Sequence, residues 1–268
     1  MTFEANKNTI DFLRDIRSNG RYAFTFEEIV ETIGKPAKNI RKDIDRLREK
    51  GMVRNIRKGF FIIIPDEYSK MGVIPVEFYV DDLMKYLSRQ YYVGLFSAAM
   101  LHGAAHQQPQ EFFIISESPK TRNIKNRDIM INFSEKKHFP LAGIESRKTD
   151  TGYFKISDKA LTFLDLIYFE NLMGGFSRIT TILKELSEDI KPAAMKSAAD
   201  NGFPASVFQR AGYLAEQILQ NNKLVTVFEQ KLASMNFQAA YLKASGQKTG
   251  VKDAKWKLFI NTKIETDV

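Results

Sequence analysis

The sequence predicts an α+β protein in two parts, on three observations. Two short helices, a tight turn and a basic hairpin follow one another between residues 25 and 64, in the order typical of a winged helix-turn-helix. Short apolar runs suited to strands lie between residues 76 and 156, and helical apolar spacing follows from 157 to 245. We therefore expect a winged helix-turn-helix over residues 1–66, followed over residues 67–268 by a domain that is mixed α/β first and largely helical afterwards.

Capping signals bound the two short helices. Thr25 and Glu28 have the spacing of a capping box, in which each side chain accepts a hydrogen bond from the other residue's backbone N–H. The helix that begins there is expected to end at Gly34. Pro36 is expected at the first position of the second helix, where its missing N–H costs nothing, and Gly51 is expected to end that helix.

The second helix has an apolar stripe, formed by Ile40, Ile44 and Leu47, and a basic remainder. The residues expected to contact DNA lie off this stripe and at the tip of the following hairpin: Lys38, Asn39, Arg41, Lys42, Arg46, Arg57 and Lys58. Among them Asn39 is the candidate for reading a base edge, with adenine as the best match. The segment Lys35–Lys58 has ten basic and three acidic residues, a net charge of +7 against +8 for the whole chain. Charge concentrated in this way suits counterion release from DNA phosphates.

The hairpin that follows is expected to be both a wing and a packing element. Met52–Ile56 and Phe60–Ile64 are its two expected strands, around the turn Arg57–Gly59. The second strand is apolar on both faces, so we expect at least one face to pack on the rest of the protein. An earlier helix over Phe3–Ser18 would complete the winged domain.

The second part is expected to start with short helices and strands and to continue as a row of helices. Its mixed portion, about residues 76–156, holds expected helices over Val76–Gln90 and Ser97–Ala105 and strands over Glu111–Ser116, Ile129–Phe133 and Gly152–Ile156. The expected helices beyond it are one capped by Ser157 and ended by Gly174-Gly175, one capped by Ser177 and ended before Pro192, one that starts at Pro204, and one over Leu224–Ala233. Gly246–Asp253 is expected as a loop and Trp256–Ile260 as a last strand.

Composition excludes several classes of protein. Apolar content of 44% and charged content of 27% are ordinary for a soluble globular chain. Because there is no cysteine, disulfides and thiol chemistry are excluded. The first residues lack a signal-peptide pattern, and the longest weakly polar run, Tyr91–Ala105, is too short to span a membrane. We expect a cytoplasmic protein without a membrane partner, and its net charge of +8 suits a nucleic acid.

No catalytic or metal-binding constellation is recognisable. The chain has no Gly-x-x-x-x-Gly-Lys phosphate loop, no dinucleotide-binding Gly-x-Gly-x-x-Gly after a strand and no Gly-x-Ser-x-Gly elbow. His102 and His106 have the spacing of zinc ligands on a helix, but His138 is the one other histidine and there is no thiolate. We therefore expect no metal, no cofactor and no enzyme, with an unrecognised site in residues 76–268 as the least favoured alternative.

A second basic segment accompanies the middle strands. Its residues are Lys120, Arg122, Lys125 and Arg127, followed by Lys136, Lys137, Arg147 and Lys148, and the acidic residues among them are Glu117, Asp128, Glu135 and Glu145. Two interpretations stay open for it, a solvated loop or a supplementary contact to phosphates, RNA or an acidic partner.

Four segments, in their order and spacing, resemble the AbiEi family of antitoxins over nearly the full length of the chain. They are Leu47–Arg54 with Lys58–Phe61, Tyr92–Gly103 with Gln108-Pro109, Lys155–Ser157 with Ala160–Ile167, and Gly174-Gly175 with Ile182–Leu186 and Gln209–Leu214. AbiEi proteins are the antitoxins of bacterial type IV toxin–antitoxin systems, in which the toxin is a nucleotidyltransferase.

The resemblance implies roles that charge and spacing do not supply. It implies that the winged domain binds and represses the operon's own promoter, and that residues 67–268 are an antitoxin domain that opposes the toxin without needing a stable complex. A homodimer on double-stranded DNA is one expected arrangement. The segment Lys120–Lys137 departs from the family by being longer and more basic, which leaves open a regulator that acts without a toxin. Another class also stays open, a module that binds a toxin or another protein and uses the winged fold only as a scaffold.

Overall fold

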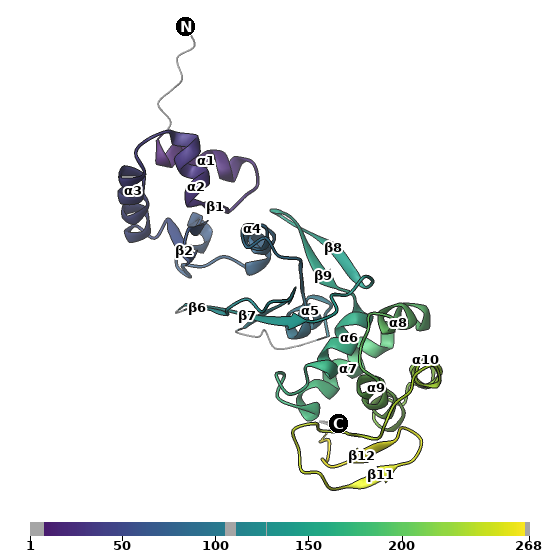
Figure 1. The fold of residues 1–268 in the computed structure, drawn as a ribbon. Helices are drawn as coiled ribbons and strands as arrows, with labels where there is room; N and C mark the ends of the chain where they lie inside the picture. The colour runs from purple at the N-terminus through teal and green to yellow at the C-terminus, as the bar shows by residue number, and fades with distance from the viewer. Residues whose placement is uncertain (1–7, 105–110, 127, 266–268) are drawn as a thin grey trace.

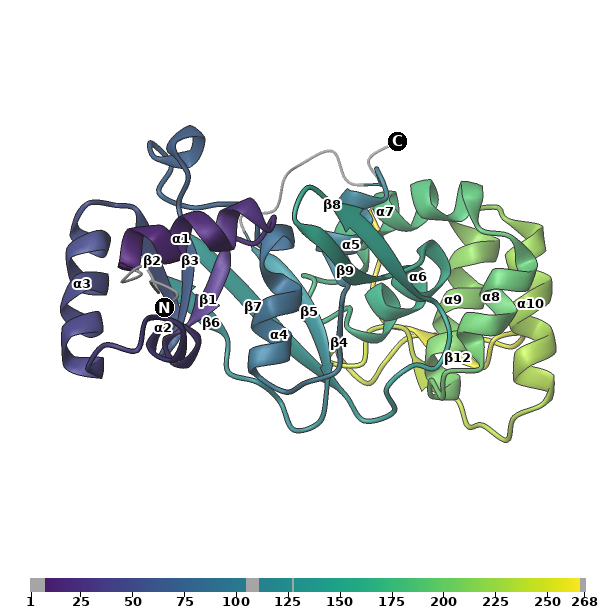
Figure 2. The same cartoon turned by 90° about the horizontal axis from the view of Figure 1, so that it is seen from above.

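The computed structural model describes residues 8–104, 111–126 and 128–265. The molecule is elongated, with an N-terminal unit of helices at one end, a central sheet, and a helical layer followed by a small C-terminal sheet at the other end (Figure 1). Seen from above, α3 (Ala37–Glu49) and α10 (Asn222–Ala233) lie at opposite ends (Figure 2). None of the helices in the described ranges has the length and apolar character needed to cross a membrane.

The N-terminal unit combines three helices with a small antiparallel sheet. In chain order its elements are α1 (Thr9–Ser18), β1 (Ala23–Thr25), α2 (Phe26–Ile33), α3, β2 (Val53–Arg57) and β3 (Phe60–Ile63). β3 lies between β1 and β2 and pairs with both. The expected hairpin is confirmed, with strand ends within one residue of the prediction. The expected first helix begins at Thr9, and residues 1–7 lie outside the described ranges.

The predicted caps of α2 are confirmed, whereas the predicted start of α3 is wrong by one residue. Thr25 Oγ1 accepts from the Glu28 backbone N–H at 3.0 Å, and Glu28 Oε2 accepts from the Thr25 N–H at 3.4 Å. Gly34 ends α2 with a left-handed φ of 69°. Pro36 is not the first helical residue: its ψ of 130° is extended, so it precedes α3, and its carbonyl accepts from the Asn39 N–H at 2.8 Å.

α3 has the buried stripe and the glycine end that its sequence predicts. Ile40, Ile44 and Leu47 are all buried. Gly51 has a φ of 71°, and the N–H of Met52 bonds the Leu47 carbonyl at 3.0 Å. This is the 6→1 bond of a Schellman motif, which satisfies a carbonyl at the helix end.

β3 joins the N-terminal unit to the rest of the molecule, because both of its faces are buried. Phe61 and Ile63 belong to the core between the sheet and α1–α3. Phe60, Ile62 and Ile64 face the other way, into a core shared with α4 (Val80–Tyr86) and the central sheet. The expectation that this strand packs on the rest of the protein is confirmed.

The central sheet has six strands in the order β6-β7-β5-β4-β9-β8. Their bounds are β4 Tyr91–Val93, β5 Phe112–Glu117, β6 Ile124–Asn126, β7 Ile129–Lys136, β8 Ile144–Thr149 and β9 Gly152–Ser157. Alternate side chains serve two cores: Ile114 faces α4 and the N-terminal unit, whereas Phe113 and Ile115 face the helical layer. The sheet therefore lies between the N-terminal unit and the helices of the C-terminal half.

Three expectations in this portion need correction. The predicted helix Val76–Gln90 is a 3₁₀ turn, η2 (Val76–Phe78), followed by the short α4, because Tyr79 leaves helical geometry with a φ of −137°. A further 3₁₀ turn, η1 (Asp66–Tyr68), precedes it. The predicted helix Ser97–Ala105 is α5 (Leu95–Leu101), which begins two residues earlier and ends before His102, while Ala105 lies outside the described residues. β4, β6 and β8 were not predicted; β8 is a largely exposed edge strand without an apolar alternation.

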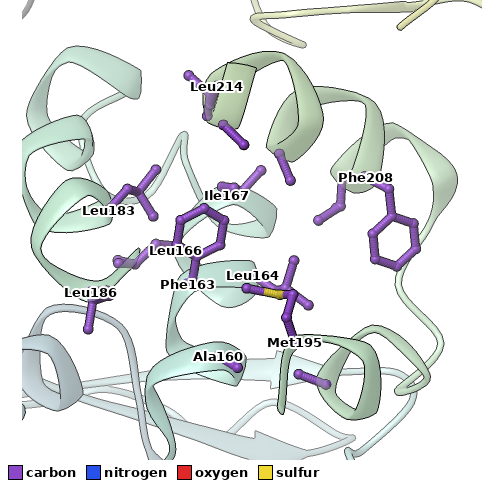
Figure 3. Close-up of a cluster of buried hydrophobic side chains, with 14 of the residues drawn as sticks. Ala160, Phe163, Leu164, Leu166, Ile167, Leu183, Leu186, Met195, Phe208 and Leu214 are labelled. Carbon is purple, nitrogen blue, oxygen red and sulfur yellow. The ribbon is translucent and has the colours of Figure 1, made fainter. Parts of the chain in front are cut away.

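The C-terminal half packs five helices around the long apolar side chains of α6. These helices are α6 (Lys159–Tyr168), α7 (Phe176–Asp189), α8 (Pro192–Ala199), α9 (Ala205–Gln217) and α10. In Figure 3, Phe163 and Leu166 of α6 lie toward Leu183 of α7, while Phe208 and Leu214 come from α9. All of these side chains are fully buried, so this layer holds its own core.

The boundaries of these helices differ from the prediction at several ends. Asp158, not Ser157, caps α6, and its carboxylate accepts from the Leu161 N–H at 2.7 Å. α6 stops at Tyr168, so Gly174-Gly175 precedes α7 rather than ending α6. Gly175, with a φ of 91°, occupies the cap position expected for Ser177. α8 was not predicted, because Pro192 was interpreted as a stop, whereas it is the first residue of a new helix.

A small three-stranded sheet closes the described part of the chain. Its strands are β10 (Ala240–Tyr241), β11 (Val251–Asp253) and β12 (Leu258–Ile260), in the order β10-β12-β11. The expected last strand is therefore shorter than Trp256–Ile260, and the expected loop Gly246–Asp253 includes β11. Trp256 itself is buried against α9 and donates from Nε1 to Glu216 at 2.7 Å.

Candidate nucleic-acid interface

The basic side chains expected on the second short helix lie together on the exposed surface of α3. Its exposed residues include Lys38, Asn39, Arg41, Lys42 and Arg46. α3 forms one end of the molecule, so this surface faces away from the central sheet (Figure 2). Within the described ranges no carboxylate lies within ion-pairing distance of Lys38 or Lys42, so both ammonium groups are available to an anion.

Two arginines of α3 have interaction partners within the N-terminal unit. The Arg41 guanidinium lies over the ring of Phe26, 5.0 Å from its centroid, which holds this side chain toward α2. Arg46 lies 3.5 Å from Asp43, which also accepts from the Thr9 hydroxyl at 3.2 Å. These exposed pairs contribute little to stability, but they restrict where the two arginines point.

The hairpin turn is fixed on the protein rather than projecting as a free wing. The Lys58 carbonyl accepts from the Tyr86 hydroxyl of α4 at 2.9 Å, and the Gly59 carbonyl accepts from the Phe26 N–H at 2.8 Å. Lys58 is exposed, whereas Arg57 is half-buried. Of the two residues expected at the wing tip, Lys58 therefore has the freer side chain.

Two arginines connect the N-terminal unit to neighbouring elements. Arg54 of β2 donates to Asp128 at 2.9 Å and to the Gly72 carbonyl at 2.9 Å. Arg21 lies 2.6 Å from Glu28 and 3.5 Å from Asp82 of α4, and its hydrogen bond to Glu28 raises the pKa of the guanidinium. Together with the shared core at β3, these contacts give α3 a fixed orientation relative to the central sheet.

The part of the second basic segment that forms β6 lies beside the hairpin. Lys120, Arg122 and Lys125 are exposed, and Arg127 lies outside the described residues. Asn126 of β6 reaches the Asn55 carbonyl of β2 at 3.5 Å, so β6 and β2 are neighbours. The structure thus brings Lys125 close to the hairpin although the sequence separates them by more than sixty residues.

The histidine pair expected from sequence is described only in part. His102 follows α5, and its Nε2 lies 2.7 Å from the Ser157 carbonyl, while burial lowers the pKa of the ring. His106 lies outside the described residues. Within the described ranges no three metal-ligating side chains gather in a cluster that could hold a metal ion.

Sequence reasoning missed a buried ionic cluster between the sheet and the helical layer. The Lys136 ammonium lies 2.7 Å from Asp165 Oδ1, and the Tyr92 hydroxyl donates to Asp165 Oδ2 at 2.7 Å. All three side chains are buried, and burial raises the pKa of the Asp165 carboxyl although Lys136 and Tyr92 oppose this shift. A lone aspartate within the apolar run of α6 was the signal that could have indicated it.

Comparison with known families and solved structures gives evidence on the family and on the fold. Residues 92–217, from β4 to the end of α9, match the family model of the AbiEi antitoxin C-terminal domain. The chain carries an AbiEi antitoxin domain. The resemblance to AbiEi antitoxins seen in the sequence is thereby confirmed over residues 92–217.

The fold is also similar to a solved structure. The crystal structure of the RV2827C protein from Mycobacterium tuberculosis superposes with a TM-score of 0.61 and 15% sequence identity, over 92% of this chain and 89% of that one. At this identity the likeness concerns the fold alone. Comparison with curated proteins finds no match.

Proposed function

We propose that this AbiEi-family chain is a DNA-binding antitoxin that represses its own promoter. The observation that carries the proposal is the order α1-β1-α2-α3-β2-β3, with β3 central in the small sheet and the basic surface of α3 exposed at one end of the molecule. This arrangement supports the assignment of a winged helix-turn-helix, in which the second helix of the motif would enter the major groove. We assign residues 1–66 to this domain and residues 67–268 to the antitoxin domain.

Specific roles follow for the exposed side chains. Lys38 and Asn39 would face the groove, with Asn39 reading a base edge. Arg41, Lys42, Arg46, Arg57 and Lys58 would contact flanking phosphates. Since β6 adjoins β2, Lys120, Arg122 and Lys125 would extend the phosphate contacts beyond the hairpin. Two copies bound as a homodimer would read half-sites one helical turn apart.

The antitoxin role of the proposal concerns a nucleotidyltransferase toxin. The matched domain supports an antitoxin, and we assign it no catalytic reaction of its own. In a type IV arrangement the antitoxin opposes the toxin without needing a stable complex. A neighbouring reading frame that encodes a nucleotidyltransferase would identify the partner.

A second function, a protein-binding module built on the winged scaffold, is favoured by one observation. The hairpin turn is held on α4 through Tyr86, so the tip is less free to reach a groove than a projecting wing. Under this alternative the chain would copurify with its partner and have no preference for its own upstream DNA.

One titration separates the two functions. Fluorescence anisotropy of labelled upstream DNA and of a scrambled duplex measures affinity at several salt concentrations. The proposal expects at least tenfold tighter binding to the upstream sequence. Equal, weak binding to both duplexes would contradict autorepression and favour the scaffold function.

The antitoxin half has a separate test. Expression of the full chain together with the neighbouring nucleotidyltransferase should restore growth that the toxin alone arrests. A variant of the chain with Lys38→Ala and Lys42→Ala should still restore growth while losing promoter binding. Failure of the intact chain to restore growth would contradict the antitoxin role and leave the regulatory role standing.

A further inference from the structure

A pocket of about 250 Å³ lies where the end of β7 meets the loop between α8 and α9. The side chains that define it are Lys136, Lys137, His138, Tyr168 and Phe203. No acidic residue contributes to this lining. A pocket with two ammonium groups, an imidazole and two aromatic rings is suited to an anion that also has a flat surface.

Lys136 forms the buried part of this pocket and has unused hydrogen-bonding capacity. Its side chain is 5% exposed, with Nζ 2.7 Å from Asp165 and 3.7 Å from the centroid of the Phe203 ring. An ammonium group has three N–H donors, of which Asp165 accepts one and the ring face attracts another. No third acceptor for Lys136 occurs among the described residues. A ligand in the pocket would supply that acceptor.

The charges around the pocket favour an anion. Asp165 accepts from both Lys136 and the Tyr92 hydroxyl, so its negative charge is engaged away from the pocket. Lys137 is exposed at the rim and adds a positive charge without an ion pair from the described residues. α9 also begins at this rim, after Pro204, and no side chain caps its first N–H groups. The helix dipole therefore adds to the positive potential that Lys137 creates.

The loops that flank the pocket are held in place by one buried amide. Asn201 Oδ1 accepts from the N–H groups of Leu141 and Ala142 at 3.0 and 3.1 Å, and its Nδ2 donates to the Ala142 carbonyl at 2.8 Å. These bonds tie the loop after His138 to the turn before Gly202. A site that is ordered before binding loses less entropy when a ligand enters.

From this geometry we infer that the pocket binds a single nucleotide, through its phosphate monoester and its planar base. The phosphate would accept from Lys136 and Lys137, and the base would lie against Tyr168 or His138. The volume is below the roughly 300–1,000 Å³ of pockets for drug-sized ligands, so the pocket would hold part of one nucleotide and leave the rest at the rim, where Lys137 and His138 are exposed. This site is separate from the surface of α3 and does not depend on DNA binding.

Isothermal titration of the full chain with AMP, adenosine and inorganic phosphate tests the inference. AMP should bind with one-site saturation, and adenosine and phosphate should each bind at least tenfold more weakly. Equal binding of AMP and phosphate would overturn the role of the base. Equal binding of AMP and adenosine would overturn the anion site, and so would the absence of saturable AMP binding up to millimolar concentration.

Surface variants locate the site without disturbing the buried ion pair. Lys137→Glu should weaken AMP binding at least fivefold, whereas Lys223→Glu, a matched charge reversal at an exposed residue of α10, should change it less than twofold. Tyr168→Leu should reduce the preference for AMP over phosphate while leaving phosphate binding intact. Equal effects of the two lysine substitutions would mean that AMP binding depends only on the overall charge of the protein. That result would overturn the location of the site at this pocket. If Tyr168→Leu and His138→Ala both kept the full preference for AMP over phosphate, the proposed stacking of the base would be overturned.

Discussion

The Tyr86 hydroxyl donates a hydrogen bond to the Lys58 carbonyl at 2.9 Å, and its ring lies 5.5 Å from that of Phe60. The turn of the hairpin is therefore attached to α4, an element outside the N-terminal unit. This attachment determines how far the expected wing can move relative to the central sheet.

Tyr86→Phe tests the attachment. The side chain is 36% exposed, so water can reach the freed carbonyl and the loss should be about 0.5–1.5 kcal/mol in the free energy of unfolding. Urea denaturation measures it, with Tyr153→Phe as the control because that side chain is 61% exposed. An equal effect of both substitutions would mean that the bond to Lys58 contributes nothing specific.

Lys136→Met should be among the most destabilising single substitutions in the chain. It leaves the Asp165 carboxylate buried with the Tyr92 hydroxyl as its remaining partner, which should cost about 3–5 kcal/mol. Addition of Asp165→Asn removes the stranded charge and should restore at least half of that loss, as a double-mutant cycle in urea would show. Strictly additive losses would contradict the coupling of the two residues.

Gly212→Ala should destabilise the protein although alanine is the better helix former. Gly212 lies within α9, where the substitution would gain about 1 kcal/mol from helix propensity. The Trp256 ring occupies the space that a Cβ at this position would need, and overpacking of this kind costs about 1–3 kcal/mol. Thermal unfolding should show a lower Tm for Gly212→Ala, and a smaller decrease when Trp256→Phe is already present. A raised Tm in the single variant would contradict the close contact.

Glu170 should make stability depend on pH. It is 1% exposed, and burial raises its pKa against the opposing charges of Arg210 and Lys243 and a hydrogen bond from the Ala244 backbone. Since the folded state holds this proton more tightly than the unfolded state, the contribution of Glu170 is present below the ordinary value of 4.5 and is lost as the pH rises through the folded pKa.

The measurement is the difference in unfolding free energy between Glu170→Gln and the natural chain. This difference should shift in favour of Glu170→Gln as the pH rises from about 4.5 toward neutrality. Glu188→Gln, at an exposed position of α7, is the control and should show no such trend. A difference that shifts in the opposite direction would contradict the raised pKa.

Local signals in the sequence predicted much of the N-terminal unit. The capping box at Thr25, the stripe at Ile40 and the glycine end at Gly51 each depend on residues within one or two turns, so their geometry follows from the sequence. The incorrect predictions concern elements whose local sequence signals are ambiguous or absent. α8 is short and begins with Pro192, which marks both a stop and a start, and β8 gains its order from pairing with β9 rather than from its own residues.

The sequence identified the basic residues of the candidate interface, but it did not identify the contacts that hold the neighbouring elements in place. The basic residues of α3 were named from spacing and charge, and the structure places them on one exposed helix. The contact of Lys58 with Tyr86 and the pair of Lys136 with Asp165 join residues far apart in the chain. Such contacts depend on how the elements pack, which periodicity and capping do not encode.

The most direct test of the proposed DNA contact is the salt dependence of binding to upstream DNA by the natural chain, Arg41→Ala, Lys42→Ala and Lys223→Ala. If Arg41 and Lys42 contact phosphates, each of their variants should bind more weakly and flatten the slope of log K against log salt by about one unit. Lys223→Ala, on the opposite end of the molecule, should leave the slope unchanged. Slopes that are identical in all four proteins would remove α3 from the interface and contradict the proposal.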